Sequence, residues 1–429
     1  MLTTRSTLLR MTPLALMLMA RTVTAQEAFT TLAVEGRTNA NPSVAVAGKF
    51  VVVAWSGALV KSMDIYLATS NDGGQTFSAP VQVNAVDGDA RVNGEMPPRL
   101  ALVPRRGKTP EIVVVWTAKN ATSWAIQSAR SVDGGHTFGP ATAVPGSDGP
   151  GARGWESVTM DDKGHVYAMW LDHRAMVAAD AGRPHTMPAA GSAPAPMPKQ
   201  DPTERAGLSN LYFASLDGSS AQSITNSVCY CCKTSLATAG NNVYAVWRHV
   251  YPGSIRDMAF TISTDRGHTF AAPVRISEDH WQIDGCPDNG PAIAVDGKRR
   301  AHVVWPTAAD PKDASAGLAV FYASSTDGRR FSDRVRVPSR GPAQHAQIVI
   351  GGDGAPVVAW DESVEGTRRI GFARVRLDAS GAATLSTIAA PDAGPGQWYP
   401  ALAPTSDGAI AAWVRQAEKG SVIGVGRLR

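Results

Sequence analysis

The sequence predicts an all-β protein, a single β-propeller of four-stranded blades, with seven blades favoured and six as the alternative. A tryptophan closes an apolar, β-rich run seven times, mostly at intervals of roughly 55 residues, which is typical of one four-stranded blade. An eight-residue turn pattern also recurs between these runs. The seven tryptophans are Trp55, Trp116, Trp170, Trp247, Trp305, Trp360 and Trp413.

The recurring turn has the pattern S-x-D-x-G-x-T-F. It is complete at residues 70–77, 131–138 and 263–270, and shortened at 325–331. The aspartate can accept hydrogen bonds from backbone N–H groups of its own turn, and the glycine supplies a position with φ > 0. The pattern therefore predicts tight turns between strands, and its aspartates are Asp72, Asp133, Asp265 and Asp327.

The first unit shows the expected order of strands, at residues 42–46, 50–55, 64–69 and 81–83. The last unit, residues 399–427, ends after about three strands. The apolar segment 29–34 precedes the first unit and has no other partner. We expect it to supply the missing strand, because this closes the ring and hides the edges that an open sheet would expose.

Two segments lie outside this repeat. Residues 1–25 contain Arg5 and Arg10, an apolar run at 11–20 and small residues at 23–25, which is typical of a secretory signal peptide. The apolar run is too short to span a bilayer. We therefore expect a secreted or periplasmic propeller domain of residues 26–429 without a membrane anchor. Residues 175–207, rich in Ala, Pro and Met, predict a long lid-like insertion.

The charge gives no indication of a nucleic-acid partner. The formal net charge is +4, and three of the arginines lie in the first 25 residues, which contain no acidic residue. The remaining chain is close to neutral, so its basic pI gives no argument for nucleic-acid binding. We expect a monomer.

The turns also indicate where a ligand would bind. In a propeller, the turns between third and fourth strands lie on one face. The opposite face carries the loops that lead into each first strand and the loops between second and third strands. Loops on a rigid scaffold usually carry function, so we expect the site on that opposite face.

The S-x-D-x-G-x-T-F turn resembles the Asp box, or BNR repeat, of the sialidase (neuraminidase) superfamily of β-propellers. Those proteins have six blades. The resemblance implies a site with three arginines that hold a carboxylate, a tyrosine nucleophile, a glutamate that activates it and an aspartate acid/base. Residues 156–166 are similar to the stretch that bears the glutamate, and residues 398–402 to the stretch that bears the tyrosine.

By this resemblance Glu156 and Tyr399 would be catalytic, and Arg37, Arg174 and Arg256 would bind the substrate carboxylate. Arg37 is not followed by the Ile-Pro or Leu-Pro of the family motif, and no aspartate matches the acid/base. The alternative is that the arginines are ordinary rim charges and that Tyr399 packs at the start of a strand.

Trp281 and Trp398 fall in loops on the same face, where an indole ring could stack on a sugar. The alternative is that both are core residues.

The four cysteines, Cys229, Cys231, Cys232 and Cys286, fall in two neighbouring loops that lead into first strands. An even number in an exported protein favours two disulfides, one of which would join the loops. The alternative is a soft-metal site, with copper as the ion, because thiolate, thioether and imidazole ligands suit it. The further ligands would be His173, Met176, His185 and Met187.

Two functions follow from the sequence. The first is a site for a glycan or small anionic ligand, with sialidase-type glycoside hydrolysis as the reaction. The second is a non-enzymatic binding or scaffold propeller, in which the cysteine cluster clamps two blades or binds copper.

Overall fold

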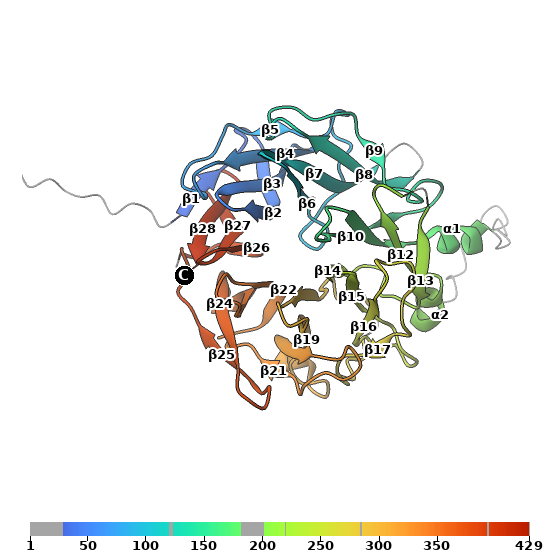
Figure 1. Cartoon of the computed structure of the whole chain (residues 1–429). Helices are drawn as coiled ribbons and strands as arrows, with labels where there is room; N and C mark the ends of the chain where they lie inside the picture. Colours follow the sequence, from blue (N-terminus) through green and yellow to red (C-terminus); the bar gives the residue numbers. More distant parts are fainter. Residues whose placement is uncertain are drawn as a thin grey trace, which may run out of the picture.

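In a computed structural model, the described residues form seven four-stranded antiparallel sheets arranged as a ring (Figure 1). The structure describes residues 29–119, 123–181, 201–218, 220–283, 285–392 and 394–428. The predicted seven-bladed propeller is confirmed, and the six-bladed alternative is wrong.

The blades follow one another along the chain, and each is numbered by its place. Blade 1 comprises β2 (Thr38–Ala47), β3 (Phe50–Ala58), β4 (Met63–Ser70) and β5 (Val81–Gln82). Blade 2 comprises β6 (Arg99–Arg105), β7 (Lys108–Lys119), β8 (Trp124–Ser131) and β9 (Thr142–Ala143). Blade 3 comprises β10 (Arg153–Met160), β11 (Val166–Asp172), β12 (Asn210–Ser215) and β13 (Gln222–Asn226). Blade 4 comprises β14 (Ser235–Ala239), β15 (Asn242–Arg248), β16 (Met258–Ser263) and β17 (Val274–Arg275).

The remaining three blades follow the same order. Blade 5 comprises β18 (Ala292–Val295), β19 (Ala301–Ala308), β20 (Leu318–Ser325) and β21 (Val335–Arg336), with a 3-10 turn at Ala314–Ala316. Blade 6 comprises β22 (Ala343–Ile350), β23 (Pro356–Val364), β24 (Thr367–Leu377) and β25 (Ala383–Thr387). Blade 7 comprises β26 (Gln397–Thr405), β27 (Gly408–Gln416), β28 (Ser421–Leu428) and β1 (Phe29–Leu32).

The N-terminal strand closes the ring, as the sequence predicts. β1 pairs antiparallel with β28, in a register from Phe29 opposite Gly426 to Leu32 opposite Ile423. Figure 1 shows the two strands side by side. Blade 7 is therefore built from both ends of the chain.

The core lies between neighbouring blades. Each of seven apolar clusters combines buried residues of two adjacent blades. The second strand of each blade is buried on both faces, which explains its continuous Val, Ala and Trp runs. The seven marker tryptophans lie in these strands, and each is at most 1% exposed.

The repeated turns have the predicted hydrogen bonds. Asp72 accepts bonds from the backbone N–H groups of Gln75 (2.9 Å) and Thr76 (3.0 Å) and from the Thr76 hydroxyl. The turns at Asp133 and Asp265 have the same carboxylate–threonine bonds. In the shortened turn, Asp327 accepts bonds from the backbone N–H groups of Arg329 and Arg330.

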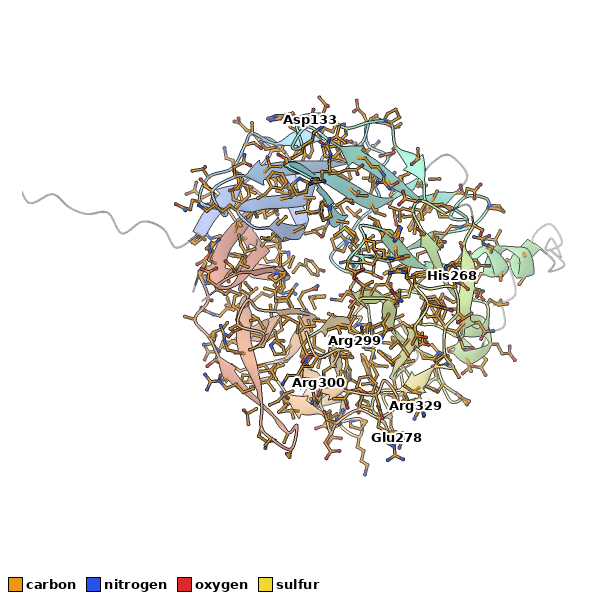
Figure 2. The ribbon with its side chains drawn as sticks, viewed as in Figure 1. Asp133, His268, Glu278, Arg299, Arg300 and Arg329 are labelled. Carbon is orange, nitrogen blue, oxygen red and sulfur yellow. A yellow bond between two sulfur atoms is a disulfide. The ribbon has the colours of Figure 1, made fainter. Side chains whose placement is uncertain are left out.

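These turns connect third and fourth strands near the outside of the ring. Figure 2 shows the labelled side chains of Asp133 and Arg329 at the outer rim. The turn phenylalanine joins two blades, since Phe270 packs edge-on against Phe213 of blade 3 and Phe331 against Phe260 of blade 4.

The described ends of the 175–207 segment, which the sequence predicted as a long lid-like insertion, are helical. They form α1 (Arg174–Ala181) and α2 (Pro202–Gly207). The Asp201 carboxylate caps α2 by accepting a bond from the Thr203 N–H, and Pro202 suits the first helical turn. Both helices lie at the outer side of blade 3 (Figure 1).

Some predictions fall outside the described residues, namely the signal peptide at 1–25 and the ligands His185 and Met187. In the part of the chain that the structure describes, no helix has the length and apolar character needed to cross a membrane.

The marker tryptophans differ in their polar contacts, which gives a test of the core. The indole N–H of Trp305 donates to Asp279 (2.7 Å), whereas that of Trp116 has no partner among the described residues. Both Trp→Phe changes remove the same atoms. We expect Trp305→Phe to be more destabilising than Trp116→Phe by about 1.5–3 kcal/mol, the usual contribution of a hydrogen bond to a charged group. Equilibrium denaturation measures both, and equal losses would contradict this account.

Candidate functional site

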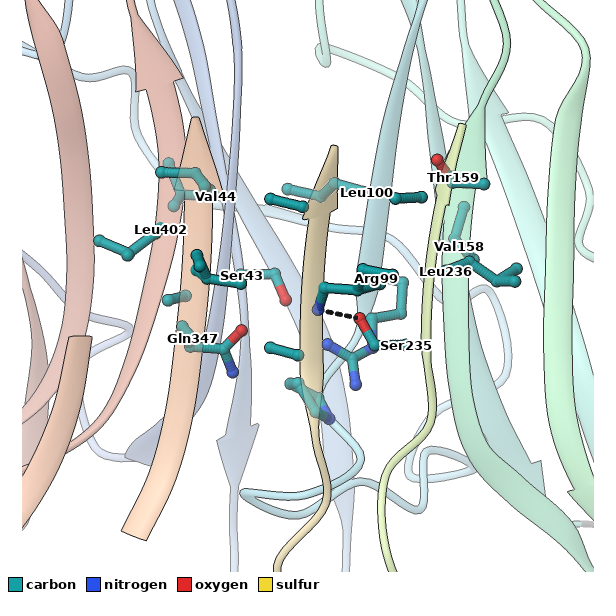
Figure 3. A pocket seen from close by; sticks show the side chains of 18 of the residues that line it. Ser43, Val44, Arg99, Leu100, Val158, Thr159, Ser235, Leu236, Gln347 and Leu402 are labelled. Carbon is teal, nitrogen blue, oxygen red and sulfur yellow. Dashed lines mark hydrogen bonds between the residues drawn. The ribbon is translucent and has the colours of Figure 1, made fainter. Parts of the chain in front are cut away.

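The first strands of all seven blades line the central channel and enclose a pocket of about 460 Å³. Each strand contributes at least one branched aliphatic residue to the wall, and Figure 3 labels five of them. Polar side chains such as Ser43, Thr159 and Gln347 lie between them. The aliphatic residues are Val44, Leu100, Val158, Leu236, Ile293, Ile348 and Leu402.

Four of the first strands carry the same irregularity at the mouth of this channel. β2, β10, β22 and β26 each shift register against the second strand three residues before the aliphatic position. The residues at the shifts have φ between 52° and 56°: Asn41, Trp155, His345 and Tyr399. A left-handed conformation costs a non-glycine residue of order 1–3 kcal/mol, and such strain clusters at functional sites.

Two of these residues meet through a buried carboxylate. Asp361 of β23 lies 2.8 Å from His345 Nδ1, accepts a 2.9 Å bond from the Tyr399 N–H, and accepts a 2.6 Å bond from Arg368. The rings of His345 and Tyr399 are in contact, with centroids 4.3 Å apart. Asp361 thus fixes the positions of both strained residues.

The charges around Asp361 govern its protonation. Burial alone would raise the pKa of Asp361, but His345, Arg368 and the Tyr399 N–H outweigh burial and hold the pKa below its ordinary value. Burial raises the pKa of the Tyr399 phenol, although the Arg368 charge opposes the shift. Tyr399 is therefore a protonated phenol at neutral pH, and it lines the pocket.

A second polar group comes from blades 2 and 3. Arg99 lines the pocket and donates through Nε to the Glu156 carbonyl at 2.8 Å. The Glu156 carboxylate is fully buried and accepts one bond, from the Thr117 hydroxyl at 2.9 Å. Burial raises the pKa of Glu156, against the opposing charge of Arg99. Arg99 Nη2 and Glu156 Oε1 are both buried without a hydrogen-bond partner among the described residues.

Glu95 is the third buried carboxylate of this region. Its Oε2 accepts bonds from the backbone N–H groups of Lys233 (3.3 Å) and Gly290 (2.5 Å), so it joins the loops that lead into blades 4 and 5. Its Oε1 is 3.7 Å from Lys233 Nζ and lacks a hydrogen bond among the described residues.

The Glu95 loop also packs against the tyrosine. A Cβ atom built at Gly94 would lie only 2.0 Å from the Tyr399 ring, so only glycine fits there. The ring is thus held between Gly94 and His345.

The three arginines predicted to hold a carboxylate do not come together. Arg37 donates to Asp64 at 2.7 Å on the outer part of blade 1. Arg174 makes a two-point contact with Asp172, at 2.8 and 2.7 Å. Arg256 is fully buried beside the cysteine cluster. The expected arginine clamp is therefore not formed, because nearby acceptors bind each guanidinium separately.

Of the predicted catalytic pair, Tyr399 lines the pocket, while Glu156 packs against Thr117 and Arg99. Trp398 packs in the apolar cluster between blades 7 and 1. Trp281 is 9% exposed, with the Arg248 guanidinium 4.7 Å from its ring centre. Trp281 thus has the packing expected of a core residue, whereas Trp398 is only partly buried.

The cysteines form one disulfide between the two loops, Cys231–Cys286, as one prediction required. Cys229 and Cys232 are buried free thiols with their sulfurs 3.5 Å apart, so a second bridge is not formed. Burial alone would raise the pKa of Cys229, but the hydrogen bond with Cys232 and the charge of Arg256 lower it. Burial and the contact with Cys229 raise the pKa of Cys232.

Of the other predicted metal ligands, His173 and Met176 are buried. The His173 ring packs against Trp155, with centroids 5.7 Å apart, and burial lowers the pKa of His173 to about 4. The compact sulfur group comprises Cys229, Cys231 and Cys232, whose Sγ atoms all lie within 4.8 Å of one another.

Sequence reasoning assigned no site role to His345, Asp361, Arg368, Arg99 or Glu95. A positional signal exists for some of them. The strained residues fall 14 or 15 residues before the marker tryptophan of their blade, so an alignment of the blades on tryptophan places His345 and Tyr399 at equivalent positions. No comparable pattern marks the buried carboxylates.

Comparisons with known proteins show the fold. No protein-family model matches the chain, and no curated protein matches it. An α-L-arabinofuranosidase of Fusarium graminearum, solved with arabinobiose, is 12% identical with a TM-score of 0.51 over 93% of this chain and 97% of that one. A polysaccharide lyase, an ulvan lyase, is 9% identical with a TM-score of 0.51 over 90% and 96%. A trans-sialidase of Ruminococcus gnavus is 10% identical over 91% and 94%, but its TM-score of 0.42 supports no inference.

The Asp361 network predicts a dependence of stability on pH. A carboxyl whose pKa is lowered on folding stabilises the protein above its unfolded pKa of about 3.9, and this contribution disappears as the pH falls through the folded pKa. We expect Asp361→Asn to cost about 1.5–3 kcal/mol at pH 7, and the difference from wild type to shrink below about pH 4. Denaturation at a series of pH values measures it. Glu418→Gln, at an exposed carboxylate, is the control and should show neither effect.

Proposed function

We propose that this protein binds a carbohydrate at the mouth of the central channel and cleaves a glycosidic bond there. The observation that carries the proposal is a set of buried polar atoms without hydrogen-bond partners among the described residues. They are Nη2 of the pocket-lining Arg99, Oε1 of Glu156, which contacts Arg99, and Oε1 of Glu95, which follows the pocket-lining Gly94. Buried polar groups are normally hydrogen-bonded, and each unpaired one costs roughly 1–3 kcal/mol.

This set suits a sugar because it contains both donor and acceptor atoms. A hydroxyl group can donate to a carboxylate and accept from a guanidinium, so a polyhydroxylated ligand has groups that match both kinds of atom. A simple anion would satisfy Arg99 and would be repelled by the two carboxylates. The aliphatic channel wall and the Tyr399 ring offer apolar surface for the faces of a sugar ring.

Two residues have the chemistry for bond cleavage. The Tyr399 phenol is protonated and lines the pocket, and Asp361 holds the Tyr399 backbone N–H, so we assign to the phenol the donation of a proton to the leaving oxygen. Glu95 Oε1 accepts no hydrogen bond among the described residues, although Lys233 Nζ lies 3.7 Å away, and the residue before Glu95 packs on the Tyr399 ring, so we assign to Glu95 the acceptance of a proton from water. His345 positions Tyr399 through ring contact.

The structural neighbours give the substrates to be tried first. One is an arabinofuranosidase in complex with arabinobiose, and the other an ulvan lyase bound to a glucuronate–rhamnose sulfate unit. The resemblance of the repeated turns to those of sialidases adds a sialoside. The proposal extends to an exported protein, and the disulfide Cys231–Cys286 supports this, because disulfides persist in oxidising compartments.

Assays with fluorogenic α-L-arabinofuranosides and sialosides, and with ulvan, test the activity. We expect turnover of one of these classes and a loss of kcat by a factor of about 10² or more in Tyr399→Phe, as is usual for a removed acid–base group. His136→Ala, in a turn on the opposite face, should keep full activity. Turnover that persists in Tyr399→Phe would exclude Tyr399 as the proton donor. A lack of turnover with all three substrate classes would contradict the proposed reaction.

The close contact at Gly94 gives an independent test. Gly94→Ala places a methyl group where the Tyr399 ring lies, so we expect kcat/KM to fall by a factor of about 10² because the ring must move. Gly297→Ala is the matched control, since a Cβ there meets nothing within 4 Å. Comparable activity in the two variants would argue against a site at this position.

A further inference from the structure

The sulfur cluster beside the channel has the geometry of a metal–thiolate site. Cys229 Sγ lies 3.8 Å from Cys231 Sγ and 3.5 Å from Cys232 Sγ. With thiolate–metal bonds of about 2.3 Å, sulfurs around one ion are about 3.8–4.0 Å apart. Binding an ion would therefore require only small movements of these side chains.

The surroundings suit a group of negative charge. Arg256 Nη1 donates to Cys229 Sγ at 3.1 Å, and Arg256 Nη2 is buried without a partner among the described residues. Arg248 is also fully buried. Two buried guanidinium groups next to three sulfurs can offset the charge of thiolates bound to a monovalent ion, which would otherwise be costly in a low dielectric.

One of the three sulfurs is held in the disulfide with Cys286. The cluster residues are buried among Ala206 of α2 and Val250, whereas Cys286 is exposed. A dithiol reductant can therefore reach the bridge from the Cys286 side.

We infer that reduction of the Cys231–Cys286 disulfide turns Cys229, Cys231 and Cys232 into a binding site for one soft, thiophilic ion of the Cu(I) class. One thiol of the reductant attacks Cys286 Sγ, and the Cys231–Cys286 bond breaks, leaving a thiolate on Cys231. The second thiol of the reductant then releases Cys286 as a thiol, and the reductant leaves as a disulfide. The reductant supplies the two electrons and two protons, and the bound ion displaces protons from the three thiols.

Three sulfur ligands favour Cu(I) over the alternatives. Thiolates select soft ions and exclude Mg²⁺ and Ca²⁺, whose ligands are oxygen atoms. Structural zinc sites take four protein ligands. The site is separate from the proposed carbohydrate site, although Cys232 is followed directly by Lys233 at the channel mouth.

The test is an anaerobic titration with Cu(I) supplied as a complex with a colorimetric chelator. Reduced wild-type protein should take one Cu(I) per chain, at least about 100-fold more tightly than protein with the disulfide intact. Cys286→Ser removes the bridging partner and leaves Cys231 free. It should match the reduced protein without any dithiol.

Variants separate the ligands from their neighbours. Cys229→Ser and Cys232→Ser should each lose at least about 100-fold in affinity after reduction. His173→Gln should bind as wild type does, because the ligand set comprises cysteines alone. Circular dichroism establishes that each variant is folded. Weak binding in both reduced wild type and Cys286→Ser, or equal binding before and after reduction, would overturn the inference.

Discussion

The packing of each blade on its neighbours is the interaction on which the rest of this structure depends. Every apolar cluster draws its residues from two blades, so no blade has a core of its own. The antiparallel pair β1–β28 completes blade 7, and Leu32 of β1 lies in the cluster between blades 7 and 1. Because the ring is closed, the first strands are held at fixed positions around the axis. The channel mouth is then a rigid frame on which loops can place side chains.

Within this frame, three buried carboxylates lie near one end of the channel. The middle is lined by aliphatic residues, whereas Asp361, Glu95 and Glu156 lie at the mouth with little or no exposure. Buried carboxylates are tolerated when neighbours bind and neutralise them. Asp361 contacts His345 Nδ1 and is paired with the Arg368 guanidinium. The strained conformations next to these groups are maintained because the surrounding bonds hold them.

The sequence predicts much more of the fold than of the site. The tryptophan spacing reflects burial on both faces of each second strand, a local property that repeats, so the blade number follows from it. Ring closure follows from the incomplete last unit and the unpartnered segment 29–34. The aspartate turns can also be predicted from the sequence, because their hydrogen bonds join residues of the same turn. Side-chain pairing in loops is different. Arg174 is captured by Asp172, two residues away, and Arg37 by Asp64, 27 residues away. A family resemblance could place these arginines on the right face but could not show that a nearby carboxylate binds each of them first.

Of the two disulfides predicted from the sequence, the one that joins the two loops is confirmed. The two loops lead into adjacent blades, so topology alone brings Cys231 and Cys286 together. The second pair depends on side-chain directions within a four-residue turn, which topology does not fix. Glu95 joins the same two loops through their backbone.

The pairing of β1 with β28 has a consequence for biosynthesis. A ribosome releases the chain from its N-terminus, and domains generally fold in that order. Here the partner of residue 29 lies at residue 426, so the earliest strand stays without its ladder until nearly the whole chain has emerged. Contacts between such distant residues form slowly. The nascent chain therefore exposes an unpaired sheet edge for most of its synthesis, and any fragment truncated before β28 keeps that edge open to aggregation or proteolysis.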